Sequence, residues 1–155
     1  SDVCSSDLTA EEIFEDINDL DYFISGVGTG GTVTGVGKNL KEKISGLKVV
    51  AVEPSKSPVL SGGNPGAHKI QGIGAGFVPG NYDSSIIDEV VQVTDEDAFK
   101  TAKDFAAQEG VLIGISSGAA VFAAIELAKK VGKGKKILAI APDGGEKYIS
   151  MGLYD

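Results

Sequence analysis

The sequence predicts an α/β protein with three layers, α/β/α, in which helices cover both faces of a mainly parallel β-sheet. Apolar runs of strand length alternate along the chain with segments whose apolar residues repeat at helical spacing. Two of these runs, residues 48–52 and 137–141, are apolar at consecutive positions apart from Lys48 at the start of the first. Such runs are typical of strands that are buried on both faces of a parallel sheet. The length of 155 residues suits one domain of ordinary size.

The N-terminal region divides into two parts. Residues 1–8 are small and polar without periodicity, and we expect them to be a leader of artefactual origin outside the domain, which we assign to residues 9–155. The sequence Thr9-Ala10-Glu11-Glu12 has the form of a capping box and predicts a short helix. A buried strand is then predicted at residues 22–24.

A glycine-rich turn follows this strand and runs from Ser25 to Thr32. Beyond it, apolar residues recur at helical spacing over residues 33–44 and predict a helix. Glycine lets the backbone approach a ligand closely, and the first turn of a helix presents unpaired N–H groups at the positive end of its dipole. The turn is therefore expected to bind an anion, most simply a phosphate.

Residues 55–81 are rich in Gly, Pro, Ser and Asn, and few apolar residues interrupt them. A segment of this length without regular structure inside a compact domain is usually functional, so we expect it to contribute to a binding site.

The second half of the chain continues the alternation. A strand is predicted at residues 89–93, and acidic residues after Thr94 favour a helix start that leads to a helix ending at Gly110. A short extended run at residues 111–113 precedes a turn at 114–118. We predict that a largely apolar, buried helix spans residues 119–130, and that the last strand spans residues 137–141.

Composition excludes several classes of function. The formal net charge of −8 and the lack of a basic run argue against nucleic-acid binding. No apolar run approaches the roughly 20 residues of a membrane span, and no signal peptide is visible, so a cytoplasmic protein is expected. The single cysteine, Cys4, excludes an internal disulfide, and with only one histidine, His68, no metal cluster is expected.

The glycine-rich turn also matches the fingerprint of a dinucleotide-binding fold. Gly26, Gly28 and Gly31 have the required spacing between a strand and a helix, and Glu53 ends the next strand, where a carboxylate can bind a ribose. On these residues alone, a Rossmann module that binds NAD is a reasonable interpretation. A tight turn that needs glycine only for packing remains a further alternative.

Five motifs in a fixed order point elsewhere. From about Thr9 to Asp155 the chain resembles the C-terminal half of the cysteine synthase family, also called O-acetylserine sulfhydrylases, among the fold-type-II pyridoxal-phosphate enzymes. The motifs are Gly26-Val27-Gly28-Thr29-Gly30-Gly31-Thr32-Val33-Thr34-Gly35, Val52-Glu53-Pro54, His68-Lys69-Ile70-Gln71-Gly72-Ile73-Gly74-Ala75-Gly76-Phe77, Gly114-Ile115-Ser116-Ser117-Gly118-Ala119-Ala120 and Pro142-Asp143-Gly144-Gly145-Glu146-Lys147-Tyr148. The resemblance implies the large cofactor-binding domain of that fold, truncated.

The resemblance also implies roles for particular residues. The phosphate of pyridoxal 5′-phosphate would be held by Gly28, Thr29, Gly30, Gly31 and Thr32. Ser116 would hydrogen-bond the pyridine nitrogen of the cofactor, with Ser117 as a cap or turn residue. The substrate side of the pocket would be formed by Gln71, Gly72 and Ile73. In this interpretation Glu53 is structural, and His68 has no established part in proton transfer.

The resemblance implies that the parent enzyme makes L-cysteine from O-acetylserine and sulfide by β-replacement. The family's Schiff-base lysine and its substrate carboxylate loop have no counterpart in this sequence, and Lys69 is not a candidate. No catalytic residue is therefore assigned, and the fragment is expected to be inactive alone. Alternatives are a cystathionine β-synthase-like or O-phosphoserine-using relative, and a non-catalytic domain that binds the C-terminal tail of serine acetyltransferase. A homodimer is implied for the full-length protein.

Overall fold

A five-stranded sheet forms the centre of the protein. The computed structural model describes residues 20–27, 31–70, 73–74, 76–78, 80, 82–109, 114–132, 134–141 and 147–152. The strands, in the spatial order β3-β2-β1-β4-β5, are β1 (Tyr22–Gly26), β2 (Lys48–Pro54), β3 (Glu89–Val93), β4 (Lys136–Ala141) and β5 (Lys147–Gly152).

The sheet is mainly parallel, as predicted. β1 runs parallel to both β2 and β4, β2 runs parallel to β3, and only β5 runs antiparallel, beside β4. The chain first builds outward from β1 to β3 and then returns to the other side of β1 to form β4. The direction in which strands are added therefore reverses between β1 and β4.

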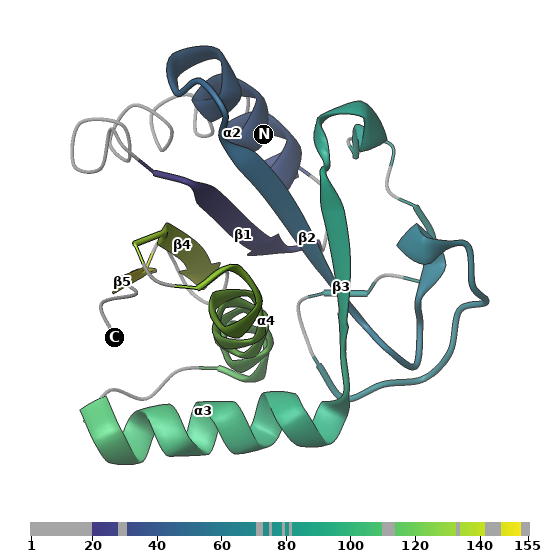
Figure 1. Ribbon diagram of the computed structural model, residues 1–155. Helices are drawn as coiled ribbons and strands as arrows, with labels where there is room; N and C mark the ends of the chain where they lie inside the picture. The colour runs from purple at the N-terminus through teal and green to yellow at the C-terminus, as the bar shows by residue number, and fades with distance from the viewer. Residues whose placement is uncertain are drawn as a thin grey trace.

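Helices cover both faces of the sheet, which confirms the three-layer prediction (Figure 1). Helix α2 (Gly31–Lys43) lies on one face, and α4 (Ile115–Val131) lies on the other, with α3 (Asp95–Glu109) packed across α4. Alternate strand residues face the two helical layers. Phe23 and Val49 pack with the α2 residue Val36, whereas Ile24 and Val50 pack on the α4 side.

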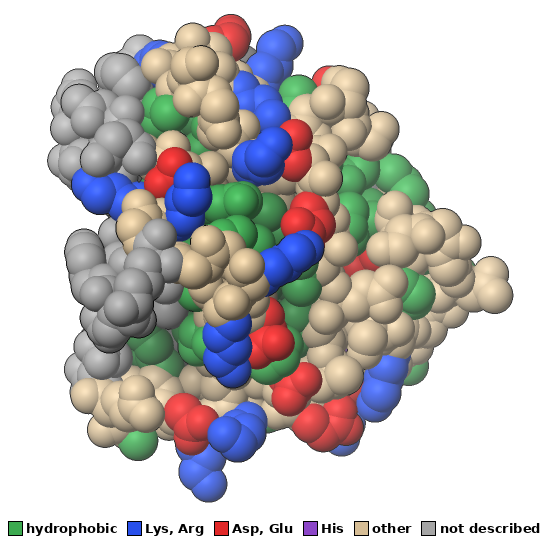
Figure 2. All heavy atoms as spheres, viewed as in Figure 1, with side chains coloured by type: hydrophobic (Ala, Val, Ile, Leu, Met, Phe, Trp, Pro, Cys, Tyr) green, Lys and Arg blue, Asp and Glu red, His purple; other side chains and the backbone are tan. Residues whose placement is uncertain are grey.

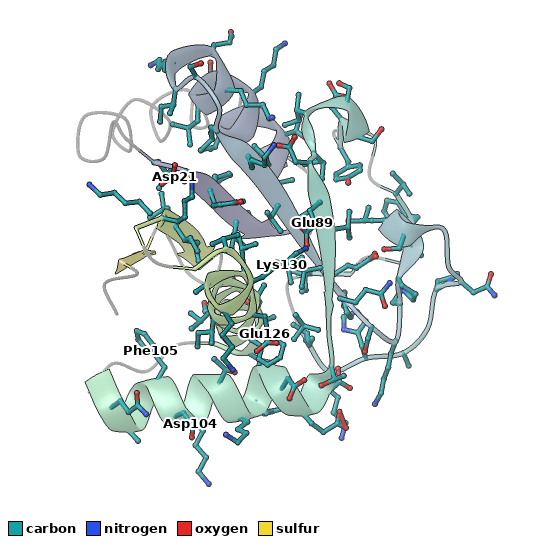
Figure 3. All side chains as sticks on the ribbon, in the orientation of Figure 1. Asp21, Glu89, Asp104, Phe105, Glu126 and Lys130 are labelled. Carbon is teal, nitrogen blue, oxygen red and sulfur yellow. The ribbon has the colours of Figure 1, made fainter. Side chains whose placement is uncertain are left out.

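Asp21 joins three strands at the start of β1 (Figure 3). Its backbone N–H donates to Lys136 O over 3.0 Å, and its Oδ2 accepts from Lys136 N–H over 2.9 Å. Its carbonyl oxygen accepts from Lys48 N–H over 3.0 Å. These bonds set the relative register of β1, β2 and β4 at their amino ends, opposite the edge where the glycine-rich turn begins.

The long segment after β2 is anchored by short local structure. A 3₁₀ helix, η1, spans Val59–Ser61, and a second, η2, spans Ser84–Ile86. In η2 the carboxylate of Asp83 caps the helix by accepting from Ser85 N–H over 2.9 Å. Asp88 Oδ2 accepts from Val49 N–H over 2.7 Å, which joins the residue before β3 to β2.

The structure differs from the prediction at the start of one helix and in one strand. Helix α4 begins at Ile115 and not at Ala119, because Gly114 is the N-cap with extended backbone. Ser116 and Ser117 therefore lie in the first helical turn, and the assignment of Ser117 as a cap or turn residue is wrong. No strand was predicted at β5. The predicted helix that starts near Thr9, the run at residues 111–113 and the leader lie outside the described residues.

Charged side chains of both signs are interspersed over the face of the molecule that Figure 2 shows. Several of them form pairs, such as Lys130 of α4 with Glu89 of β3, whose Nζ and Oε2 atoms lie 3.7 Å apart (Figure 3). In the part of the chain that the structure describes, no helix combines the length and the hydropathy needed to cross a membrane.

Candidate functional site

The candidate site lies at the carboxyl edge of the parallel strands. In open α/β sheets, ligands bind outside the carboxyl ends of the strands where the direction of strand addition reverses. That point lies between β1 and β4 in this sheet. The glycine-rich turn leaves β1 at Gly26 and enters α2 at Gly31, so it stands at the expected position.

Helix α2 begins with two of the predicted phosphate-binding residues, Gly31 and Thr32. The first turn of α2 contains no acidic residue, so its free N–H groups and positive dipole end have no competing side-chain anion from the helix itself. This arrangement suits a phosphate. The other predicted phosphate-binding residues, Gly28, Thr29 and Gly30, lie outside the described residues.

Ile73, predicted on the substrate side, packs at the base of the glycine-rich turn. It is 4 % exposed, and a Cβ atom added to Gly26 would lie 2.6 Å from its Cγ2 atom. The next residue, Gly74, donates its N–H to Val27 O over 3.1 Å. The structure therefore places Ile73 beside the residues that lead into the turn. Gln71 and Gly72 lie outside the described residues.

His68 is half-buried, and both of its ring nitrogens contact the backbone. Ile70 N–H donates to Nδ1 over 3.1 Å, and Nε2 lies 2.8 Å from Gly74 O. These two contacts join both ring nitrogens to the backbone. That His68 has no established part in proton transfer stays a prediction.

Ser116 is fully buried in the first turn of α4. One turn later, Ala119 and Ala120 belong to the same core cluster as Ile73 and Ile24. The first turn of α4 therefore lies on the side of the sheet where Ile73 is packed, and Ser116 supplies a buried hydroxyl there. Its predicted contact with a cofactor ring stays a prediction.

Glu53 is not positioned as a ribose ligand. It is 1 % exposed, and its Oε1 accepts from Leu60 N–H over 2.7 Å while its Oε2 accepts from Ser61 Oγ over 2.5 Å. The carboxylate is used to anchor η1 to the end of β2. The alternative of a dinucleotide-binding module, which needs this carboxylate at the ligand, is therefore not favoured.

Asp95 is a second buried carboxylate, whose tertiary role sequence reasoning missed. Its Oδ1 accepts from Lys69 N–H over 3.2 Å, and its Oδ2 pairs with Lys56 Nζ at 3.1 Å. Burial raises its pKa, but the bonds from Lys69 and Lys56 outweigh burial and hold the pKa below its ordinary value. The bond to Asp95 raises the pKa of Lys56. For Asp95, the sequence indicated only a position at the start of a helix.

The comparisons with known proteins decide the family. The family model described as "Pyridoxal-phosphate dependent enzyme" matches residues 4–143. The chain belongs to this family. Membership confirms the resemblance inferred from the motifs, and it confirms pyridoxal 5′-phosphate as the cofactor of the family. The site residues that would hold it are not tested by this match.

Within the pyridoxal-phosphate-dependent family, the chain is similar to cysteine synthases. A cysteine synthase from Staphylococcus aureus is 51 % identical over 135 residues, which cover 87 % of this chain and 44 % of that protein. The chain therefore spans less than half the length of the curated relatives it matches.

Solved structures of the family share the fold. The cysteine synthase of Entamoeba histolytica is 44 % identical with a TM-score of 0.88, over 90 % of this chain and 42 % of that one. An O-acetylserine-dependent cystathionine β-synthase from Helicobacter pylori is 38 % identical with a TM-score of 0.78, over 83 % of this chain and 42 % of that one. The predicted α/β fold is thus confirmed by experimental neighbours.

Proposed function

We propose that this chain is the phosphate-binding part of a pyridoxal-phosphate-dependent cysteine synthase, which makes L-cysteine from O-acetylserine and sulfide by β-replacement. The observation that carries the proposal is the glycine-rich turn, which enters α2 at the reversal point of the sheet. It does so in a chain 51 % identical over 135 residues to a cysteine synthase.

The proposed phosphate cup runs from Gly28 to Thr32. Backbone N–H groups at the start of α2 would donate to the phosphate oxygens, and the positive end of the helix dipole would stabilise their charge. The hydroxyls of Thr29 and Thr32 would donate to further oxygens. A terminal phosphate monoester exposes more oxygens than a bridging pyrophosphate, so two hydroxyls suit the monoester better.

Ser116 is the proposed partner of the pyridine nitrogen. When bound, the cofactor supplies an electron-withdrawing ring that stabilises negative charge on the substrate's α-carbon. A serine hydroxyl can donate a hydrogen bond to a neutral ring nitrogen, whereas a carboxylate would keep that nitrogen protonated. The weaker electron sink favours departure of a β-leaving group such as acetate.

The substrate side of the pocket is assigned to Gln71, Gly72 and Ile73. No lysine of this sequence lies in a motif like that of the family's Schiff-base lysine. We therefore propose that the amine that attaches the cofactor and removes the α-proton comes from outside these 155 residues. The chain by itself would then bind the phosphate group without catalysing the reaction.

The proposed partners follow from the family resemblance. Full-length members are expected to be homodimers, and the C-terminal tail of serine acetyltransferase is a candidate peptide ligand. Chromatography with light scattering on a complete protein would test the dimer.

A binding experiment tests the phosphate cup directly. The chain would be titrated with pyridoxamine 5′-phosphate, which lacks the aldehyde that reacts with surface lysines, and with pyridoxamine and NAD as comparisons. Phosphorus NMR and calorimetry should show binding of pyridoxamine 5′-phosphate, and calorimetry should show no binding of pyridoxamine or NAD. Thr29→Val should weaken binding, whereas Thr101→Val on α3 should not. Tight NAD binding with no binding of the phosphate ester would overturn the proposal.

A complementation experiment tests the reaction. The N-terminal segment of the Staphylococcus aureus enzyme, joined to this chain as a chimera, would supply the missing lysine. Incubation with O-acetylserine and sulfide should yield cysteine. Faster turnover of O-phosphoserine, or of serine with homocysteine, would instead assign the chain to one of the alternative substrate classes.

A further inference from the structure

The imidazole of His68 bridges two backbone positions of one segment. Ile70 N–H donates to Nδ1, and Nε2 lies 2.8 Å from the carbonyl oxygen of Gly74. Ile70 is fully buried. The ring therefore joins the beginning and the end of residues 70–74, the segment that contains the predicted substrate-side residues.

The two contacts determine where the ring proton lies. A backbone N–H can only donate and a backbone carbonyl can only accept. Nδ1 must therefore carry the lone pair that faces Ile70, and Nε2 must carry the proton that faces Gly74. His68 is thus the neutral Nε2–H tautomer, because a proton on Nδ1 would place two N–H donors, that of Nδ1 and that of Ile70, face to face.

Gly74 is held on three sides. Its backbone has a φ of +67°, and a Cβ atom there would lie 2.6 Å from His68 Nε2 and 2.6 Å from Pro54 Cγ. Its N–H donates to Val27 O over 3.1 Å. The ring of His68 therefore contacts a residue that is hydrogen-bonded to Val27, the residue that follows β1.

The backbone that carries the ring is also fixed. The N–H of the adjacent residue, Lys69, donates to the buried Asp95 at the start of α3. Because Asp95 is itself paired with Lys56, the position of the chain at His68 is set by contacts outside the segment.

We propose that His68 is a positioning residue of the active site. By bonding to both Ile70 and Gly74, whose N–H donates to Val27 O, its Nε2–H tautomer holds Ile73 against Gly26, at the base of the glycine-rich turn. The consequence for catalysis rests on the proposed function, whereas the hydrogen-bonding role does not.

The tautomer can be measured without ambiguity because His68 is the only histidine of the chain. Long-range proton–nitrogen NMR of the labelled chain, with the ring neutral, should show a protonated Nε2 and an unprotonated Nδ1. The opposite tautomer, or the mixture typical of a solvent-exposed ring, would overturn the assignment.

Matched substitutions separate the two contacts. His68→Phe removes both nitrogens, His68→Asn keeps an acceptor near the position of Nδ1, and His68→Gln keeps a donor near that of Nε2. Amide exchange at Ile70 and Gly74 should speed up roughly five- to tenfold in His68→Phe. His68→Asn should restore protection mainly at Ile70, and His68→Gln mainly at Gly74. The amide of Ile24 in β1 reports whether the fold is intact.

Unchanged protection in His68→Phe would overturn the proposal. If that variant does not fold, the contrast between His68→Asn and His68→Gln decides the same question, since a residue that only fills space would not distinguish them.

The chimera tests the catalytic consequence. His68→Phe should raise KM for O-acetylserine about tenfold with kcat changed less, and His68→Gln should recover part of the loss, whereas the exposed control Lys69→Gln should leave both unchanged. Loss of protection with an unchanged KM would overturn the positioning role. A chimera without any activity would count against the proposed function and leave the NMR result standing.

Discussion

At the scale of single residues, two buried contacts explain why particular side chains are present. Glu53 has the sequence position of a ribose ligand, but its two oxygens serve Leu60 and Ser61. Gly26 has the position of a fingerprint glycine, but the Ile73 side chain occupies the space that a Cβ atom at this position would need. Both residues are explained by the packing of the segment after β2.

Replacement of Glu53 should destabilise the fold. Glu53→Ala leaves the donors of Leu60 and Ser61 without their acceptor, so we expect a loss of about 1–3 kcal/mol in the free energy of unfolding. Urea denaturation followed by circular dichroism measures it. The exposed Glu42→Ala on α2 is the matched control and should cost less than about 0.5 kcal/mol. Equal losses would show that Glu53 is not an anchor.

Gly26 and Ile73 should be energetically coupled. Gly26→Ala alone forces a methyl group into the Cγ2 atom of Ile73 and should cost about 1–3 kcal/mol. Ile73→Ala alone leaves a cavity and should cost about 2–5 kcal/mol. In the double variant the new methyl group occupies the space that the Ile73 side chain leaves. The loss of stability in the double variant should therefore be at least about 0.5 kcal/mol smaller than the sum of the two single losses. Strict additivity in a double-mutant cycle would contradict the contact.

At the scale of elements, the close packing of α4 on α3 depends on small residues. A Cβ atom at Gly118 would lie 2.3 Å from the carbonyl oxygen of Ala98 and 2.9 Å from Ala102 Cβ. The two helices therefore cross with their backbones nearly in contact (Figure 1). Residues of α4 that follow Ser116, such as Ala119, pack in the core cluster that contains Ile73.

Gly118→Ala should separate the two helices. Alanine is better than glycine in a helix by up to about 1 kcal/mol, but the clash with a backbone oxygen should exceed that gain and lower the melting temperature. Gly80→Ala is the control, because a Cβ there meets nothing within 4 Å. Thermal unfolding of both variants gives the comparison. A more stable Gly118→Ala protein would refute the close approach.

At the scale of the whole molecule, two aspartate carboxylates, the buried Asp95 and the more exposed Asp88, connect elements that are distant in sequence. Asp95 joins α3 to the segment after β2. Asp88 joins β3 to β2 through Val49 N–H and to α2 through Lys41, whose Nζ lies 2.7 Å from Oδ2. Burial raises the pKa of Asp88, but the bonds from Lys41 and Val49 outweigh it, so the pKa is lowered.

These two aspartates should make the fold sensitive to acid. A group whose pKa is lower in the folded state than the ordinary 3.8 stabilises the fold above that value, and the contribution is lost as the pH falls through the folded pKa. The Asp88→Asn and Asp95→Asn double variant should be less stable than the parent near pH 7, and the difference should shrink toward about pH 3. Urea unfolding across this range measures it.

The exposed Asp104→Asn, which breaks only a surface pair with Lys100, is the control for this pH series and should track the parent. A difference between the double variant and the parent that stays constant with pH would contradict the assignment.

The fold class, most strand and helix positions, the glycine-rich turn and the cofactor family could be predicted from the amino-acid sequence. These depend on local periodicity, on glycine spacing and on motif order, which are all readable along the chain. Three contacts became visible only in the folded structure: Glu53 with η1, Asp95 with Lys69 N–H, and Gly74 N–H with Val27 O. Each of these contacts joins residues whose proximity depends on how separate segments pack, and local propensity carries no information about that.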